Sequence, residues 1–406
     1  MKIQKFCTWL VVVLFIGGIF TVCIGTIVTE HAKLYGSVTD RSIYGQYRPT
    51  NATIPERIGA RIQSFENSVN TYLFGREAGL SLNLAAEGAL GKQIMQFGDS
   101  RMVRLNTGHL YDLQPSADVS EQLNEIVAMR DAYLADIPLL FAYAQSTLYD
   151  EAMLPEGVAA LDHNMETADG ILAALRAADI ECIDSRQVLG DSGYALEELI
   201  LYTDQHWSSK AALLMAGEIA RNLQAKGLPV AAENLEFDQF DSLTYEDNFL
   251  GKYGQRIGAE NVQLDDMTAY WPKYDTQMHY VAIRKSTVSI DNEGTFKDAA
   301  IRWDQFENDE NRGYSTNSYK AYGLTESEQK FVNENVPEGR ILVIKDSFGA
   351  SVTSFLSLSA HEVWGVDMRT AQKTVKEYID ELQPDAVVIA YSQQMMRDYA
   401  YEIMED

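Results

Sequence analysis

Three short apolar runs near the C-terminus constrain the fold more than any other feature of this sequence. They are ILVIK (341–345), VWGVDM (363–368) and AVVIAY (386–391), and segments with helical spacing at 347–358 and 371–382 separate them. Strands that are apolar at every position are buried on both faces, and strand–helix–strand alternation is typical of a parallel sheet covered by helices. The sequence therefore predicts an α/β fold with right-handed crossovers.

The same alternation begins much earlier in the chain. Further strands are predicted at 137–144 and 180–183, and helices at 118–134, 164–177 and 208–226. Ser208 is placed to cap the start of the last of these helices, and Gly227 is placed to end it. We expect one α/β domain over residues 91–406, with an irregular insertion at about 228–335, where the regular pattern is lost.

The N-terminal residues 6–28 are almost entirely apolar. A helix of about 20 such residues crosses the hydrocarbon core of a bilayer. Lys2 and Lys5 precede the run, so the positive-inside rule leaves residues 1–5 in the cytoplasm and exports the bulk of the chain. A cleaved signal peptide is the alternative, although its apolar region is usually shorter, about 7–15 residues. We expect a single-pass anchor, followed by a stalk and helical lead-in over 29–90.

Composition excludes several classes of function. The formal net charge of -26 argues against nucleic acid as a partner. Only one of the three cysteines, Cys182, lies outside the N-terminal apolar run, so the rest of the chain has no internal disulfide framework. The sequence has no Cys or His/Glu spacing typical of a metal site and no Gly-rich phosphate loop, so we expect neither a metal nor another cofactor.

A candidate nucleophile, Ser347, directly follows the predicted strand 341–345. Open α/β folds place their sites at this carboxyl edge of the sheet. The helix that follows offers free backbone N–H groups that can stabilise an oxyanion. The alternative is that Asp346 or Ser347 only caps this helix.

A candidate base, His206, lies two residues after Asp204 and just before a strongly amphipathic helix. A histidine can accept the serine proton, and a carboxylate can orient the imidazole. Side chains two positions apart on an extended segment project from the same side. We predict that Ser347, His206 and Asp204 form a catalytic triad, with the serine hydroxyl about 2.6–3.2 Å from an imidazole nitrogen. The alternative is that Asp204 caps the helix while His206 packs locally.

Three blocks of the sequence together resemble a known family. TDQHW (203–207) resembles the signature of the DHHW family, with Gln205 in place of the first signature histidine. IKDSFG (344–349) resembles the late serine block of the same group, and FLGKYG (249–254) resembles a Gly-rich block between the two. The DHHW family is similar to the SGNH hydrolase-like proteins of polysaccharide O-acetylation, of the AlgX/AlgJ type. The resemblance implies a three-layer α/β/α fold with a mainly parallel sheet, and triad roles for Asp204, His206 and Ser347.

The resemblance also implies an activity and partners. Proteins of this type are O-acetyltransferases or esterases that pass an acyl group through a serine ester to a cell-surface polysaccharide. They often work beside a membrane-bound O-acyltransferase in the cell envelope. Many DHHW proteins have no established activity, so a non-catalytic module that binds glycan or a partner is the alternative. One departure is Lys345, which stands where many SGNH enzymes have a glycine before Asp-Ser.

Two further motifs need an interpretation. Gly251 and Gly254 are candidates to let a backbone N–H approach a bound ester, as part of an oxyanion or substrate-binding site; a flexible turn is the alternative. Ser100 follows Gly-Asp and so matches the usual Gly-Asp-Ser string more closely than Ser347 does. It precedes the Asp-x-His motif and no helix is predicted after it, so a turn is expected there.

Overall fold

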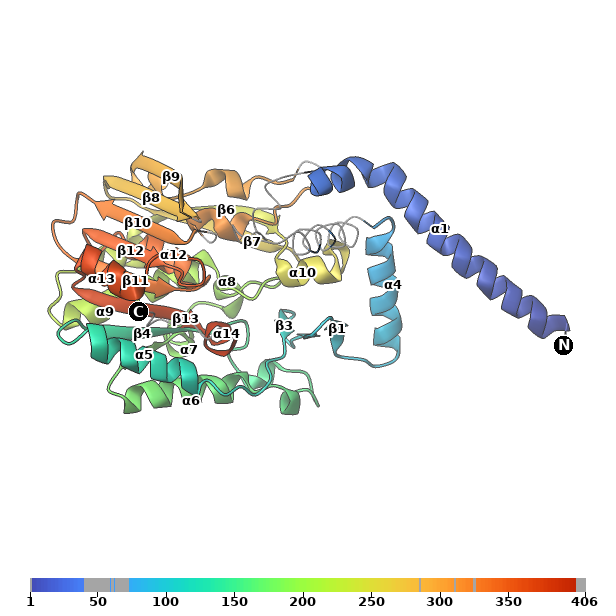
Figure 1. The fold of residues 1–406 in the computed structure, drawn as a ribbon, viewed down its shortest axis with the longest axis horizontal. Helices are drawn as coiled ribbons and strands as arrows, with labels where there is room; N and C mark the ends of the chain where they lie inside the picture. The colour runs from blue at the N-terminus through green and yellow to red at the C-terminus, as the bar shows by residue number, and fades with distance from the viewer. Residues whose placement is uncertain are drawn as a thin grey trace. The chain divides into compact units, whose positions relative to one another are not determined.

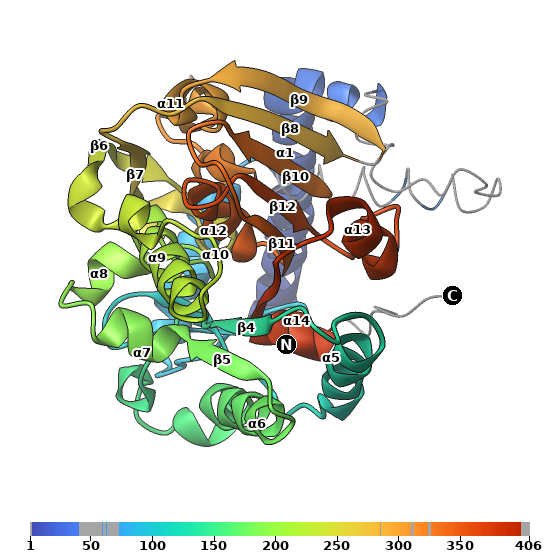
Figure 2. The same cartoon turned by 90° about the vertical axis from the view of Figure 1, so that its left-hand side faces the viewer.

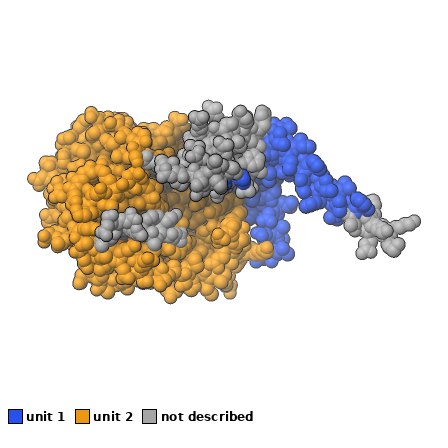
Figure 3. All heavy atoms as spheres, in the orientation of Figure 1, with its two compact units in different colours: residues 1–91 blue, residues 92–406 orange. Residues whose placement is uncertain are grey.

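The computed structural model describes residues 2–39, 59, 62, 73–284, 286–309, 312–323 and 326–398. The chain divides into two compact units, residues 1–91 and residues 92–406, which Figure 3 draws in different colours.

The first unit contains helices α1 (Lys2–Thr39) and α4 (Arg76–Ala89). Within α1, Trp9–Thr29 has a mean hydropathy of 2.7 and is long and apolar enough to cross a membrane. The predicted span 6–28 therefore lies inside one continuous helix. Most of the predicted stalk lies outside the described residues, and α4 belongs to the predicted helical lead-in.

The second unit is built on a large sheet. Its strands are β4 (Leu139–Ala144), β5 (Glu181–Asp184), β8 (Met278–Arg284), β9 (Thr287–Gly294), β10 (Glu328–Asn333), β11 (Arg340–Lys345), β12 (Glu362–Val366) and β13 (Ala386–Ser392). Within the described residues this sheet has eight strands in the order β5-β4-β13-β11-β12-β10-β8-β9. The part from β5 to β12 is parallel, and β10, β8 and β9 continue it in antiparallel fashion (Figure 1).

Helices cover both faces of this sheet. Along β11, Ile341 and Val343 join one hydrophobic core, while Leu342 and Ile344 join the other. Because successive side chains of a strand point to opposite faces, a strand buried on both sides is apolar throughout. α9 and α12 pack on one face and α5, α6 and α13 on the other, which gives the predicted α/β/α layers (Figure 2). The helices of this unit are α5 (Ser120–Tyr133), α6 (Asn164–Ala177), α7 (Ser185–Gly190), α8 (Leu196–Leu199), α9 (Ser209–Ala225), α10 (Lys252–Ile257), α11 (Phe296–Ala299), α12 (Gly349–Leu356), α13 (Val375–Leu382) and α14 (Gln393–Asp398).

Local signals define the ends of α9 as predicted. The side chain of Ser208 accepts a hydrogen bond from the N–H of Ala211 at the helix start. Past its end, Gly227 has a φ of 81°, a left-handed conformation that glycine adopts without strain.

Two small sheets complete the unit. They are formed by β1 (Met95–Phe97), β2 (Ser100–Arg104) and β3 (Leu110–Asp112), and by β6 (Phe240–Phe249) and β7 (Asp265–Pro272).

The structure corrects the prediction of an irregular insertion at 228–335. This segment contains β6 to β10, and three of these strands extend the main sheet. In β8, Met278, Tyr280 and Ala282 are buried, whereas the side chains between them are only partly buried. Antiparallel strands that are buried on only one face alternate apolar and polar side chains. This segment therefore lacks the all-apolar runs that are typical of the parallel strands.

Candidate active site

Ser347 lies in the short connection between β11 and α12, at the carboxyl edge of the sheet. The neighbouring Asp346 holds this connection in place. Its carboxylate accepts hydrogen bonds from the N–H of Phe348 at 2.9 Å and from Ser392, through N–H at 2.8 Å and Oγ at 2.6 Å. Ser392 is the last residue of the adjacent strand β13. Asp346 therefore links the carboxyl ends of β11 and β13 and fixes the connection that carries Ser347.

Lys345, which replaces the usual glycine, is fully buried. Its Nζ lies 3.5 Å from the backbone oxygen of Glu326, and its Cε would be 3.1 Å from a Cβ on Gly365. Burial lowers the pKa of this lysine. The side chain of Lys345 therefore extends toward the neighbouring strand β12.

Asp204 and His206 lie on a tight hairpin between α8 and α9. An antiparallel bridge pairs Ile200 with Trp207 and closes the hairpin. The Asp204 carboxylate accepts a hydrogen bond from His206 Nδ1 at 2.5 Å and from the His206 N–H at 3.2 Å. Its other oxygen accepts from the N–H of Lys252 at 2.7 Å. With Nδ1 as donor, Nε2 of the neutral imidazole is left as an acceptor.

The three predicted residues meet in space. The Ser347 hydroxyl lies 2.8 Å from His206 Nε2, although the two residues are 141 positions apart. Asp204 and His206 are 5% and 7% exposed, whereas Ser347 is partly exposed. The distance lies within the predicted range and is short enough for direct proton transfer.

Two aromatic side chains contact the imidazole of His206. Tyr319 stacks on it with ring centroids 4.1 Å apart, and Phe348 lies against it at 4.7 Å. Trp207 in turn packs edge-on against Phe348 at 5.3 Å. Tyr319 comes from the 3-10 turn Ser318–Tyr322, and no motif in the sequence marks it as part of this site.

The electrostatics of the pair favour a charged aspartate. Burial raises the pKa of Asp204. The positive charge of His206 and the hydrogen bonds from His206 and Lys252 lower this pKa by more than burial raises it. The net pKa lies below the ordinary value of an aspartate. Asp204 can therefore remain a carboxylate and stabilise an imidazolium at His206.

Gly251 and Gly254 pack against the hairpin rather than point their amides at the serine. Their N–H groups donate to Thr203, to its Oγ1 at 2.7 Å and to its backbone oxygen at 2.9 Å. A Cβ on Gly251 would lie 2.4 Å from the Cβ of Asp204. The two amides already have acceptors, so this geometry gives the glycines a packing role and lends no support to the predicted oxyanion role.

Ser100 opens β2, a strand of the small sheet with β1 and β3. Its hydroxyl accepts a hydrogen bond from Arg256 Nη1 at 2.7 Å. No helix follows Ser100, as the sequence predicts; the predicted turn lies on Gly98 and Asp99, and Ser100 itself begins a strand.

A small cavity of about 20 Å³ lies beside the nucleophile connection, lined by Gln205, Phe348 and Gln393 among others. Gln393 is 3% exposed, and its Nε2 has no hydrogen-bond partner among the described residues. A cavity of this volume has room for roughly one water molecule, to which a buried unpaired amide N–H can donate.

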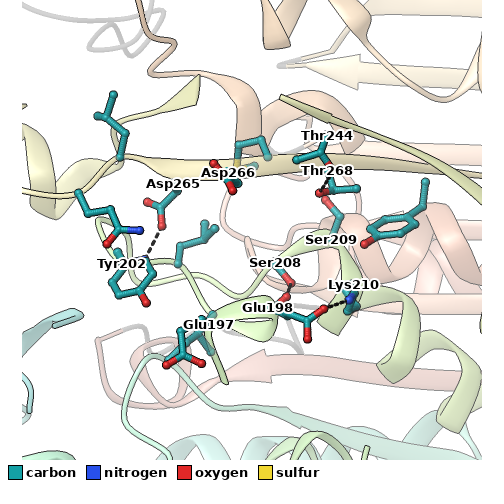
Figure 4. Close-up of a pocket in the computed structure, with 16 residues that line it drawn as sticks. Glu197, Glu198, Tyr202, Ser208, Ser209, Lys210, Thr244, Asp265, Asp266 and Thr268 are labelled. Carbon is teal, nitrogen blue, oxygen red and sulfur yellow. Dashed lines mark hydrogen bonds and ion pairs between the residues drawn. The ribbon is translucent and has the colours of Figure 1, made fainter. Parts of the chain in front are cut away.

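A larger pocket of about 420 Å³ lies next to the hairpin, and Tyr202 and Asp265 are among the residues that line it (Figure 4). Asp204, His206 and Ser347 do not line it. In the part of the chain that the structure describes, no group of three or more His, Cys, Asp or Glu side chains is arranged to hold a metal ion.

The three-layer α/β/α fold of the second unit is that of an SGNH hydrolase-like domain. Residues 109–301 match the family model described as SGNH hydrolase-like domain, acetyltransferase AlgX. The resemblance to AlgX-type SGNH hydrolase-like proteins is thereby confirmed. No curated protein sequence matches the chain.

Solved structures agree with this fold. A DHHW family protein from Eubacterium siraeum superimposes with a TM-score of 0.58 at 16% identity, covering 76% of this chain and 95% of that one. PatB1 from Bacillus cereus superimposes with a TM-score of 0.57 at 18% identity, covering 76% of this chain and 99% of that one. PatB1 has also been solved with a sulfonyl adduct.

Proposed function

We propose that this chain is a membrane-anchored SGNH-type serine enzyme, an O-acetyltransferase or acetylesterase that acts on a cell-surface polysaccharide. The observation that carries the proposal is the contact of 2.8 Å between Ser347 Oγ and His206 Nε2, with Asp204 on the other ring nitrogen. The matching family model, described as acetyltransferase AlgX, supports acetyl as the group transferred.

The geometry suits a two-step acyl transfer. Ser347 Oγ attacks the carbonyl carbon of an acyl donor while its proton passes to His206 Nε2, and Asp204 stabilises the imidazolium. In this scheme, backbone N–H groups in the first turn of α12 hold the oxyanion; the N–H of Phe348 is not one of them, because it donates to Asp346. The donor's leaving oxygen takes the proton from His206, and the acyl group stays on Ser347 as an ester.

The second step regenerates the serine. A sugar hydroxyl or a water gives its proton to His206 and attacks the ester carbonyl. The serine oxygen leaves, recovers the proton from His206, and the acyl group departs on the acceptor. A sugar acceptor makes the enzyme a transferase, and water makes it an esterase.

The N-terminal helix supports a place for this reaction at the cell membrane. The apolar stretch Trp9–Thr29 follows Lys2 and Lys5, a charge pattern that supports a location of the second unit outside the cytoplasm. In that location the acyl donor has to be supplied across the membrane, and a membrane-bound O-acyltransferase is the partner that fits this need.

Covalent labelling tests the nucleophile. We expect a serine-reactive fluorophosphonate or sulfonyl fluoride to modify the full-length chain at Ser347, as mapped by peptide mass spectrometry. Ser347→Ala should abolish labelling, and His206→Ala should slow it by about 100-fold or more, because general-base assistance contributes about 10²–10⁴. Ser100→Ala is the matched control, since it removes the hydroxyl of the Gly-Asp-Ser string at 98–100 and should label at the wild-type rate. Labelling that survives Ser347→Ala and is lost in Ser100→Ala would contradict the proposal.

Product analysis separates the possible activities. The unlabelled enzyme should hydrolyse a chromogenic acetyl ester, and an added oligosaccharide should become acetylated if the enzyme is a transferase. Release of acetate with no acetylated sugar would identify an esterase. A folded chain that binds polysaccharide but is never labelled would favour the non-catalytic binding module.

A further inference from the structure

Asp265, the first residue of β7, is buried at 3% exposed and contacts the hairpin that carries Asp204. Its Oδ1 accepts a hydrogen bond from the N–H of Tyr202 at 2.5 Å, shown as a dashed line in Figure 4. Its Oδ2 accepts from the N–H of Thr203 at 3.0 Å and from the Thr203 hydroxyl. One carboxylate thus binds both residues that directly precede Asp204.

Thr203 passes this restraint on to Asp204. Its hydroxyl oxygen also accepts from the N–H of Gly251 at 2.7 Å, and the N–H of Lys252 donates to Asp204 at 2.7 Å. A continuous hydrogen-bonded chain therefore leads from Asp265 through Thr203 and the start of α10 to the carboxylate of Asp204. The position of that carboxylate sets the orientation and tautomer of His206.

We propose that Asp265 is a positioning residue of the proposed serine enzyme, one that holds Asp204 and His206 in line with Ser347. The inference rests on the proposed function. Asp265 touches no reacting atom in this scheme; it acts through Thr203. A carboxylate is suited to this role because it accepts several hydrogen bonds at once, and hydrogen bonds to a charged group are stronger than neutral ones.

Other ionisable groups surround Asp265. Asp204 and His206 lie on the same hairpin; His109, next to β3, stacks on Tyr202 at 4.0 Å. Glu197 from α8 and the exposed Asp266 line the same pocket as Asp265 (Figure 4). Burial raises the pKa of Asp265 to about 7, and the charge of Asp204 adds to this rise, although the three donated hydrogen bonds lower it. Asp265 therefore changes protonation near neutral pH, within the range in which the enzyme would be assayed.

The variant Asp265→Asn tests this role because it keeps the size of the side chain but presents an NH₂ group to backbone donors. Small displacements of a catalytic group cost up to about 100-fold in rate, so we expect labelling of Ser347 to slow by roughly 10–100-fold. With a chromogenic acetyl ester, kcat should fall while KM stays nearly unchanged, since Asp265 does not touch the substrate. Asp266→Asn is the matched control: the neighbouring carboxylate is exposed, accepts from the N–H of Asp247 at 2.8 Å, and should not affect the rate.

Two further measurements distinguish positioning from a merely structural role. Thr203→Val removes the relay, so it should slow labelling, and the double variant with Asp265→Asn should be no slower than the slower single variant. The wild-type labelling rate should show an ionisation near pH 7 that is absent from the Asp265→Asn rate. Labelling rates are compared under conditions in which circular dichroism shows each variant to be folded, so a loss of stability alone leaves the rate constant unchanged.

The outcomes separate the two proposals. Wild-type chain that is not labelled at Ser347 overturns the proposed function and this inference with it. Wild-type chain that is labelled with dependence on His206, while Asp265→Asn keeps the wild-type rate constant and pH profile, overturns only the role of Asp265. A slower rate in Asp266→Asn equal to that in Asp265→Asn also overturns it, because the effect would then be one of general charge.

Discussion

At the scale of single residues, the pKa values of the two buried aspartates Asp204 and Asp265 are shifted in opposite directions. The pKa of Asp204 is lowered because His206 and backbone N–H groups outweigh its burial, whereas burial prevails at Asp265 and raises its pKa to about 7. Asp204 thus stays charged next to the imidazole, where charge is needed. Asp265, in contrast, becomes negatively charged only near neutral pH.

The raised pKa of Asp265 predicts a dependence of stability on pH. A carboxyl whose pKa is higher in the folded than in the unfolded chain favours folding fully below the unfolded value of 3.8, and this contribution is lost as pH rises to about 7. Its size is at most about 4 kcal/mol, from about 1.4 kcal/mol for each pKa unit. The free energy of unfolding of the full-length chain, measured by urea titration at pH 4 to 8, should fall over this range. The fall should be smaller in Asp265→Asn, and an identical fall in both would contradict the raised pKa.

At the scale of elements, the site depends on how closely the connection between β6 and α10 approaches the hairpin 200–207. Gly251 has a φ of -70°, which any residue adopts, so its need for glycine comes from contact and not from backbone conformation. A Cβ there would lie 2.6 Å from the backbone oxygen of Thr203, and 2.4 Å from the Cβ of Asp204. One element must move if a methyl group is added.

Gly251→Ala should therefore affect both stability and reactivity. We expect a loss of about 1–3 kcal/mol from overpacking, together with slower labelling of Ser347, because Asp204 is displaced. Gly170→Ala is the matched control: Gly170 is exposed within α6 with nothing near its Cβ position, so alanine should stabilise the chain by about 0.5–1 kcal/mol and leave labelling unchanged. Thermal unfolding and labelling rates of the two variants check this, and wild-type behaviour of Gly251→Ala would refute the close approach.

The elements differ in how well the sequence predicts them. The parallel strands and the helices between them follow from all-apolar runs and helical spacing, and Ser208 and Gly227 mark the ends of α9 directly. β8 to β10 were missed because β8 and β10 mix buried with partly buried side chains and β9, at the edge of the sheet, is mostly exposed. Such a pattern is compatible with loops, and only pairing with β12 through β10 makes it part of the sheet.

At the scale of the whole molecule, the chain joins an apolar helix to an α/β domain with its own core. We predict that the full-length chain stays in the membrane fraction after carbonate extraction. The double variant Phe15→Arg and Ile19→Arg should be released, because each arginine at the centre of a span costs about 2.5–3.5 kcal/mol. Leu82→Arg is the control, an exposed apolar position in α4 outside the span. Equal extraction of all three chains would argue against an anchor.

The sequence alone determined the apolar span and the succession of parallel strands and helices along the chain. It also determined the two motifs, one with Ser347 and one with Asp204 and His206. These features are local, because side-chain periodicity, helix caps and short spacings are written within a few residues. Only the tertiary structure decided that Ser347 contacts His206, 141 positions away in the sequence. The same holds for the hydrogen bonds that the amides of Gly251 and Gly254 donate to Thr203, and for the contact of Asp265 with the hairpin. Those contacts depend on which strands become neighbours in the sheet and on which buried donors remain to be paired, and no local pattern encodes either.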